Sequence, residues 1–262
     1  KTAAFVLPIL HKLLKGPRKQ TRALIITPTR ELAEQIHQTV RSLSAGTGLR
    51  SATVYGGVGA QPQIQAFQRG VEVIVACPGR LLDLHSKGQA RLNRVEILVL
   101  DEADRMFDMG FLPDVRRIIK AVPTQRQTLL FSATFQKEVE RLANQTLKKP
   151  QRVSIGMIKP VHTVSHALYP VPQHLKRVVV LELLKKTDTE SVLIFTRTKH
   201  RARRLEAQLG KAGYSVTSLH SNRTQGQRQR ALKGFKSGQF QIMVATDIAA
   251  RGLDIETISH VI

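Results

Sequence analysis

Cysteine and long hydrophobic runs are what this sequence has least of. Its one cysteine, Cys77, excludes an intramolecular disulfide, and with it a disulfide-stapled secreted scaffold and a cysteine-rich zinc fold. Apolar runs such as residues 97–100 are far shorter than the roughly 20 residues of a membrane-spanning helix. Neither a disulfide framework nor a membrane span is therefore expected.

Acidic residues are also scarce. The chain has 41 Lys and Arg against 19 Asp and Glu, which gives a formal net charge of +22 and a pI near 11.0. A protein this basic is expected to bind polyanions, most commonly nucleic acid. The alternative is a basic surface that serves solubility alone.

The chain contains enough hydrophobic residues to form more than one hydrophobic core. With 262 residues, of which 42% are hydrophobic and 23% charged, the chain is too balanced for wholesale disorder. It is also longer than a typical single domain, so two domains are expected.

Short apolar, β-branched runs alternate with amphipathic helical stretches along the first part of the chain. The expected strands are residues 23–27, 52–55, 71–76, 95–100 and 128–131. Each is nearly uninterrupted and ends in a Gly, Pro or acidic turn, as strands buried on both faces of a parallel sheet do. Between them lie helices such as residues 31–44, where Leu32, Ile36, Val40 and Leu43 recur at helical spacing. The alternation predicts an α/β fold with an open, mostly parallel sheet.

The pattern pauses at residues 156–161 and then resumes. Further strands are expected at residues 164–169, 191–195, 214–219, 241–245 and 260–262, with helices at 174–186, 199–212 and 225–236. We therefore predict two α/β domains, residues 1–157 and 158–262. The first has 24 Lys and Arg against 12 Asp and Glu, and the second has 17 against 7. Because both are basic, a ligand that spans both is favoured over one bound by a single basic tail.

Ligands of such sheets bind beyond the carboxyl ends of the strands, so the residues that follow each strand are the candidates for function. Asp101-Glu102-Ala103-Asp104 follows the fourth expected strand. Two adjacent carboxylates there could hold Mg²⁺ and accept a proton from an attacking water. Acidic residues at a helix N-terminus without chemistry are an equally good interpretation of this tetrapeptide alone.

Other strand exits carry small residues, hydroxyls and arginines that suit phosphate oxygens. They are Pro28-Thr29-Arg30, Gly56-Gly57, Cys77-Pro78-Gly79-Arg80 and Ser132-Ala133-Thr134. The chain opens with Lys1-Thr2 before an apolar helical pattern, as the closing half of a phosphate-binding loop does. Taken singly, each is also an ordinary turn or helix cap.

The order of these motifs resembles the DEAD-box RNA helicases of helicase superfamily 2 over nearly the whole chain. The second half continues the resemblance with residues 193–196, the pair Gln225 and Arg228, and residues 245–254. Asp108-Met109-Gly110-Phe111 resembles the bacterial RhlE-like branch. The resemblance implies two tandem RecA-like domains that use ATP and Mg²⁺. Cys77 departs from the family, which usually has Thr there.

The resemblance also implies roles for the nucleotide site. Lys1 and Thr2 would bind phosphate and, with Asp101, the metal, and Glu102 would be the general base. Asp104 would hydrogen-bond to Ser132 or Thr134 and couple nucleotide state to domain closure. Asp254 would contact the ribose of ATP.

RNA phosphates and 2′-hydroxyls would be met by six residues: Thr29, Arg30, Gly57, Arg80, Arg228 and Thr246. Such contacts imply little sequence preference. The expected function is ATP-dependent separation or remodelling of short RNA duplexes or RNA–protein complexes, in the cytoplasm, with ribosome-assembly or RNA-degradation proteins as further partners. The alternatives are an ATP-independent RNA-binding or annealing module and a DNA-directed superfamily 2 motor.

Both ends of the sequence fall inside motifs of this family. The glycine half of the phosphate loop and the arginine-rich HRxGRxGR segment are not in it. Because such arginines contribute about 10³–10⁵ in rate in related enzymes, these 262 residues alone are expected to hydrolyse ATP poorly.

Overall fold

The computed structural model describes residues 1–154, 164–186, 189–247, 255 and 258–262. The chain divides into two compact units, Lys1–Lys149 and Pro150–Ile262. The predicted boundary between residues 157 and 158 lies outside the described residues and stays a prediction.

The first unit contains one parallel sheet of five strands in the order β2-β3-β1-β4-β5. The strands are β1 (Ala23–Ile26), β2 (Ser51–Val54), β3 (Val73–Ala76), β4 (Ile97–Leu100) and β5 (Gln127–Leu130). Ile26 of β1 is in register with Ala76 of β3 on one side and with Leu100 of β4 on the other, so these strands end level with one another. Residues that follow different strands therefore meet at one edge of the sheet.

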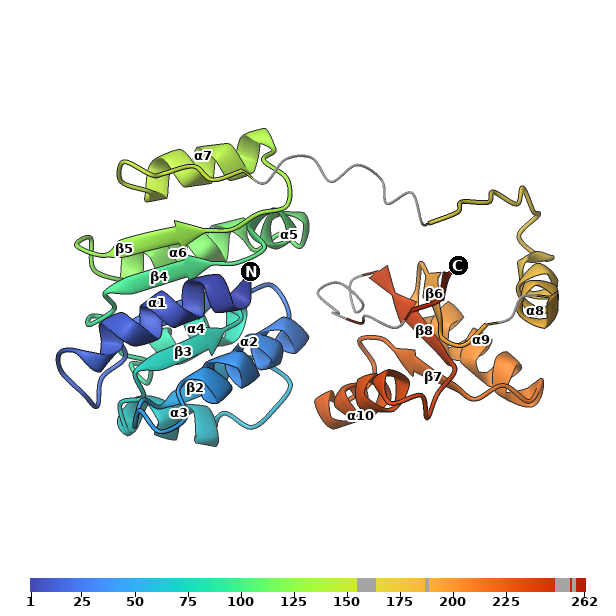
Figure 1. Cartoon of the computed structure of the whole chain (residues 1–262), viewed down its shortest axis with the longest axis horizontal. Helices are drawn as coiled ribbons and strands as arrows, with labels where there is room; N and C mark the ends of the chain where they lie inside the picture. Colours follow the sequence, from blue (N-terminus) through green and yellow to red (C-terminus); the bar gives the residue numbers. More distant parts are fainter. Residues whose placement is uncertain (155–163, 187–188, 248–254, 256–257) are drawn as a thin grey trace. The chain divides into compact units, whose positions relative to one another are not determined.

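Helices cover both faces of this sheet (Figure 1). Alternate strand residues such as Ile25 and Val99 pack on one face against α1 (Thr2–Leu14) and α2 (Arg30–Leu43). Their neighbours, such as Leu24 and Leu98, pack on the other face against five further helices. These are α3 (Gln61–Gln68), α4 (Pro78–Ser86), α5 (Ala103–Asp108), α6 (Leu112–Ala121) and α7 (Lys137–Thr146). Burial on both faces explains why β1, β3 and β4 are continuously apolar.

The second unit repeats this plan with a parallel sheet in the order β7-β8-β6-β9. Its strands are β6 (Val192–Thr196), β7 (Val216–Leu219), β8 (Ile242–Thr246) and β9 (His260–Val261). One face packs against α8 (Lys176–Lys186) and α9 (Lys199–Lys211), and the other packs against α10 (Gln225–Lys236). The chain is therefore α/β with two open parallel sheets, as predicted. No helix among the described residues has the length and apolar composition to cross a membrane.

One predicted strand is wrong. Residues 164–169 form no regular element, and Val164, Leu168 and Tyr169 are exposed. Their β-branched and aromatic composition favours a strand, but none of the strands in the described part of the chain pairs with them. Without a partner strand, β propensity does not stabilise an extended segment.

Candidate functional site: the carboxyl edge of the first sheet

Two carboxylates follow β4 directly. The N–H of Asp101 donates to the carbonyl of Ile26 at 2.9 Å, which continues the ladder between β4 and β1 by one residue. Glu102 then takes a left-handed conformation (φ 52°, ψ 53°), and its N–H donates to Asp101 Oδ1 at 3.0 Å. A left-handed backbone costs an ordinary residue about 1–2 kcal/mol, and such strain is concentrated at functional sites. The turn places both carboxylates at the edge where α5 begins.

Burial raises the pKa of both carboxyl groups. For Asp101, the bond from Glu102 N–H and the charge of Lys1 act against burial without cancelling it. For Glu102, the main opposing charge is Arg105, whose Nη1 donates to both carboxylate oxygens at 3.0 and 2.9 Å. A carboxylate with a raised pKa is a stronger base than a free one, which is the property that a general base requires.

Asp104 faces the other way, toward the segment after β5. Its Oδ2 accepts from both the N–H and the hydroxyl of Thr134, each at 3.0 Å. The N–H of Asp104 donates to Ser132 Oγ at 3.3 Å, and that hydroxyl donates to the Thr134 carbonyl at 2.6 Å. Burial acts to raise the pKa of Asp104, but the bonds from Thr134 and Ser132 outweigh it and lower the pKa. The hydrogen bonds expected between Asp104 and these two residues are therefore present.

Lys1 and Thr2 lie at the start of α1, near the same edge. Lys1 is the exposed N-cap residue, and its charge lowers the pKa of both Asp101 and Glu102, which places it close to them. No group of three or more His, Cys, Asp or Glu side chains close enough to hold a metal occurs among the described residues. Mg²⁺ with a nucleotide needs only one or two carboxylates, because phosphate oxygens and water complete its shell. A buried Asp101 within the electrostatic reach of Lys1, with Thr2 the first residue of α1, fits that requirement.

The exits of β1, β2 and β3 carry the four candidate RNA contacts of this unit. Thr29 caps α2, and its Oγ1 accepts from Leu32 N–H at 3.3 Å. Gly57 has φ +80°, and a Cβ there would lie 2.1 Å from Arg30 Nη1, so the guanidinium lies directly against this glycine. Arg80 Nη1 donates to the carbonyl of Val58, the next residue, at 3.2 Å. The loop after β2 is thus contacted by both Arg30 and Arg80.

Cys77, which stands where the family usually has Thr, lacks the hydrogen bond that a hydroxyl could make at the start of α4. Cys77 is the N-cap of α4, and its side chain makes no capping hydrogen bond. Burial raises the pKa of this thiol to about 12, so it remains protonated. A protonated thiol is a weak donor in the place where the family usually has a hydroxyl.

The order of the strands separates the two groups of candidates. Those assigned to RNA in this unit follow β2, β3 and β1, whereas the carboxylates and their coupling partners follow β4 and β5; Lys1 and Thr2 begin α1. The two groups meet between β1 and β4. At such a point, where the strand order reverses, open α/β sheets bind their ligands.

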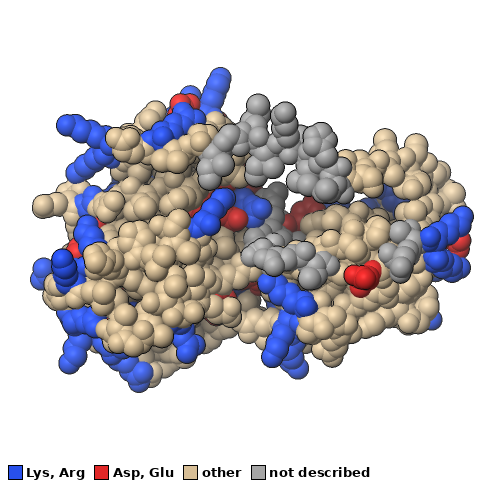
Figure 2. Space-filling view, viewed as in Figure 1, with Lys and Arg blue, Asp and Glu red and all other residues tan. Residues whose placement is uncertain are grey.

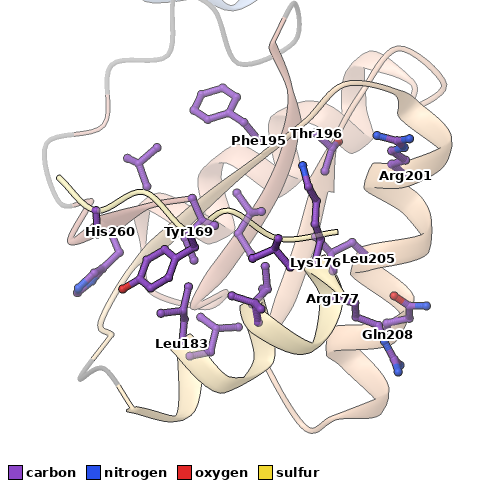
Figure 3. A pocket seen from close by; sticks show the side chains of 18 of the residues that line it. Tyr169, Lys176, Arg177, Leu183, Phe195, Thr196, Arg201, Leu205, Gln208 and His260 are labelled. Atoms are coloured by element: carbon purple, nitrogen blue, oxygen red, sulfur yellow. The ribbon is translucent and has the colours of Figure 1, made fainter. Parts of the chain in front are cut away.

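In the second unit, Thr246 ends β8 beside Thr196 of β6, with which it is in register. Arg228 lies in the first turns of α10, whose capping box is formed by Thr224 and Gln227. Asp254 lies outside the described residues. This unit also contains a groove of about 1470 Å³ between α8, α9 and the end of β6, where Tyr169, Leu183, Phe195 and Arg201 are among the lining residues (Figure 3).

Two residues of this edge were not predicted. Arg105 holds Glu102, and the spacing of three residues on a helix is a signal that could have identified it. Gln63 bonds the loop after β2 from within α3, and nothing in the local sequence distinguishes it from the exposed glutamines of the same helix. Lys and Arg side chains are spread over the visible surface of both units, with few Asp and Glu among them (Figure 2).

Comparison with known proteins agrees with this architecture. The family described as DEAD/DEAH box helicase matches residues 1–142, and the helicase conserved C-terminal domain matches residues 175–262. RNA helicase CrhR of Synechocystis is 41% identical over 264 residues, covering 100% of this chain and 53% of that protein. ATP-dependent RNA helicase RhlB of Pseudomonas aeruginosa is 42% identical over 272 residues, covering 100% of this chain and 68% of that protein.

Solved structures agree as well. Dbp5 of S. cerevisiae, bound to RNA and ADP-BeF3, has a TM-score of 0.81 and 29% identity, covering 99% of this chain and 66% of that chain. The first matched curated relatives are longer proteins, and this chain spans about half of CrhR. None of these comparisons specifies the RhlE-like branch, which stays a prediction.

Two parallel α/β units, the first with paired carboxylates at the exit of β4, match the RecA-like fold of the solved helicase structures. The chain belongs to the DEAD/DEAH box helicase family.

Proposed function

We propose that this chain is the core of an ATP-dependent RNA helicase, which hydrolyses ATP to separate or remodel short RNA duplexes or RNA–protein complexes. Support comes from the family match and from relatives that are named ATP-dependent RNA helicases. The similarity to the structure of S. cerevisiae Dbp5 bound to RNA and ADP-BeF3 supports the same pair of ligands.

The observation that carries the proposal is the turn after β4. It presents Asp101 and Glu102 side by side, while Asp104, in the first turn of α5, is bonded to Thr134 after β5. Lys1 would bind the terminal phosphates of ATP. Glu102 would accept the proton of the attacking water, and its raised pKa suits that task.

Asp101 and Thr2 would hold Mg²⁺, which when bound bridges phosphate oxygens and offsets the charge that develops on them. Asp104 would report the state of the nucleotide through its bonds to Ser132 and Thr134. Asp254 would contact the ribose, as it is expected to do by its place in the family motif.

RNA would be held through its backbone. Thr29, Arg30, Gly57 and Arg80 would meet phosphates and 2′-hydroxyls from the first unit, and Arg228 and Thr246 would do so from the second. Because these contacts do not read base edges, the protein should bind RNA with little sequence preference and should distinguish it from DNA at the 2′-hydroxyl.

Glu102→Gln in the full-length protein tests this proposal. It keeps the size of the side chain and removes the base, so RNA-stimulated ATP hydrolysis should fall by about 10²–10⁴ while RNA binding persists. Glu140→Gln, on the exposed side of α7, is the matched control and should leave hydrolysis unchanged. ATP hydrolysis is followed by phosphate release, and strand separation by the fluorescence of a labelled duplex.

The alternatives give different outcomes. If strand separation survives Glu102→Gln, the protein is an ATP-independent annealing module. If matched single-stranded DNA stimulates hydrolysis better than RNA, the protein is a DNA-directed motor. Ribosome-assembly or RNA-degradation proteins as partners, and a cytoplasmic location, stay predictions that rest on the family resemblance.

A further inference from the structure

The loop after β2 is tied together by one buried side chain. β2 is the outermost strand on its side of the described sheet, so the N–H and carbonyl of Tyr55, just after it, point away from β3 and have no strand to pair with. Gln63, in the first turn of α3 and 6% exposed, pairs with both: Oε1 accepts from Tyr55 N–H and Nε2 donates to Tyr55 O, each at 3.1 Å. A carboxamide offers a donor and an acceptor side by side, as a neighbouring strand does.

The same carboxamide also holds the far end of the loop. Gln63 Nε2 donates to the carbonyl of Gly59, again at 3.1 Å. Tyr55 and Gly59 are therefore fixed to each other through one side chain, and the three residues between them form a closed loop. Tyr55 is buried, so its backbone groups need such partners, because an unpaired buried group costs about 1–3 kcal/mol.

Each of the two arginines contacts part of this three-residue segment. The Arg30 guanidinium lies against Gly57, and Arg80 donates to the carbonyl of Val58 at 3.2 Å. The positions of these two guanidinium groups, which the proposed function assigns to RNA phosphates, thus depend on where the loop is held. Gln63 does not reach this surface, since it is buried beneath the loop.

We propose that Gln63 is a positioning residue for RNA binding: its three hydrogen bonds fix residues 56–58 and thereby place Arg30 and Arg80 for contact with the RNA backbone. This inference rests on the proposed function, because it takes these arginines to face RNA. It adds a residue that touches neither RNA nor ATP, and whose effect should fall on RNA affinity alone.

The test uses Gln63→Met in the full-length protein, since methionine has a similar length and forms none of the three hydrogen bonds. RNA affinity is measured by fluorescence anisotropy with a labelled 12-residue oligouridine in the presence of Mg²⁺ and ADP-beryllium fluoride. We expect the RNA Kd to rise about tenfold, as the loss of loop-fixing hydrogen bonds predicts, while the Kd of a fluorescent ADP stays unchanged. Gln68→Met, on an exposed glutamine at the end of the same helix, is the matched control and should change neither.

Hydrogen exchange separates positioning from a general loss of stability. Exchange should become faster in peptides that cover Tyr55–Gly59 and stay unchanged in those that cover β1 and β4. Faster exchange throughout the first unit together with weaker ADP binding would overturn the inference, because Gln63 would then be a general structural residue.

Gln63→Glu provides a second variant if the methionine variant does not fold. It keeps the acceptor for Tyr55 N–H and loses the donors to Tyr55 O and Gly59 O, so it should weaken RNA binding in the same direction. Unchanged RNA affinity in either folded variant overturns the role of Gln63 and leaves the proposed function intact. Failure of the unmodified protein to bind RNA overturns the proposed function itself.

Discussion

Replacing Gly57 by alanine should separate backbone strain from the displacement of an arginine. At φ +80° an alanine costs about 1–2 kcal/mol relative to glycine. Its Cβ would also lie 2.1 Å from Arg30 Nη1 and 2.7 Å from Cζ, closer than non-bonded atoms approach, so the guanidinium has to leave its place. Gly46 supplies the control: its φ is +76°, and a Cβ there would meet nothing within 4 Å.

Both variants should therefore lower the free energy of unfolding by about 1–2 kcal/mol, and only Gly57→Ala should weaken RNA binding. If Arg30 donates a charge-assisted hydrogen bond to a phosphate, its displacement removes about 1.5–3 kcal/mol, a loss of about tenfold or more in affinity. The slope of log K against log salt concentration should also fall by about 0.7, the value for one phosphate contact to a single strand.

Urea unfolding and fluorescence anisotropy with labelled single-stranded RNA at several salt concentrations measure these quantities. If Gly57→Ala binds RNA as tightly as Gly46→Ala does, and with the same salt dependence, Arg30 does not contact RNA from its position against Gly57. If Gly46→Ala weakens RNA binding equally, the effect is one of stability, and the argument from displacement fails.

Two further predictions concern the carboxylates. Burial raises the pKa of Asp101 in the folded protein, so the ionised carboxylate destabilises the fold at a pH above that pKa. Asp101→Asn should therefore raise the free energy of unfolding at pH 7 while abolishing ATP hydrolysis. A variant that is less stable than the parent in urea unfolding would contradict this. Asp104 should have the opposite effect on stability, because hydrogen bonds from Thr134 lower its pKa in the folded protein. Its ionised form therefore stabilises the fold at a pH above the unfolded pKa of about 3.9, and this stabilisation is lost as the pH falls through the lower folded pKa. Asp104→Asn should be less stable than the parent at pH 7 and should lose less stability on acidification below about pH 4; identical pH profiles would contradict the assignment.

The strands were predictable where burial is complete. β1, β3 and β4 have every residue buried, so their apolar runs carry the signal of a parallel sheet without ambiguity. Residues 164–169 carry a similar local signal and form no strand, because a strand also needs a partner that local sequence does not specify. Strand order, with β1 between β3 and β4, depends in the same way on pairings between distant segments.

The candidate site residues were likewise predictable where the local sequence carries the signal, and not where distant segments meet. Asp101, Glu102 and Asp104 were recognisable because one tetrapeptide at a strand exit carries all three. Arg30 packs against Gly57, which lies 27 positions further along the chain. Gln63 bonds to Tyr55 and Gly59, which lie 8 and 4 positions before it. No periodicity in the sequence marks either interaction. Gln63 differs from Gln61 and Gln68 only in being buried, which is a property of the folded chain.

The order of the strands also constrains how the two groups of candidates in the first unit could influence each other. Asp101 N–H is bonded to the Ile26 carbonyl, three residues before Thr29, so the two groups are joined there by the ladder between β4 and β1. Both strands are fully buried, and a close-packed interior does not deform continuously. If the proposed function is right, a change at the nucleotide site would therefore be carried by groups that exchange partners rather than by bending of the sheet. The bonds of Asp104 to Thr134 and of Glu102 to Arg105 meet that condition, because both lie at the edge and both involve partly exposed residues whose partners ATP could replace.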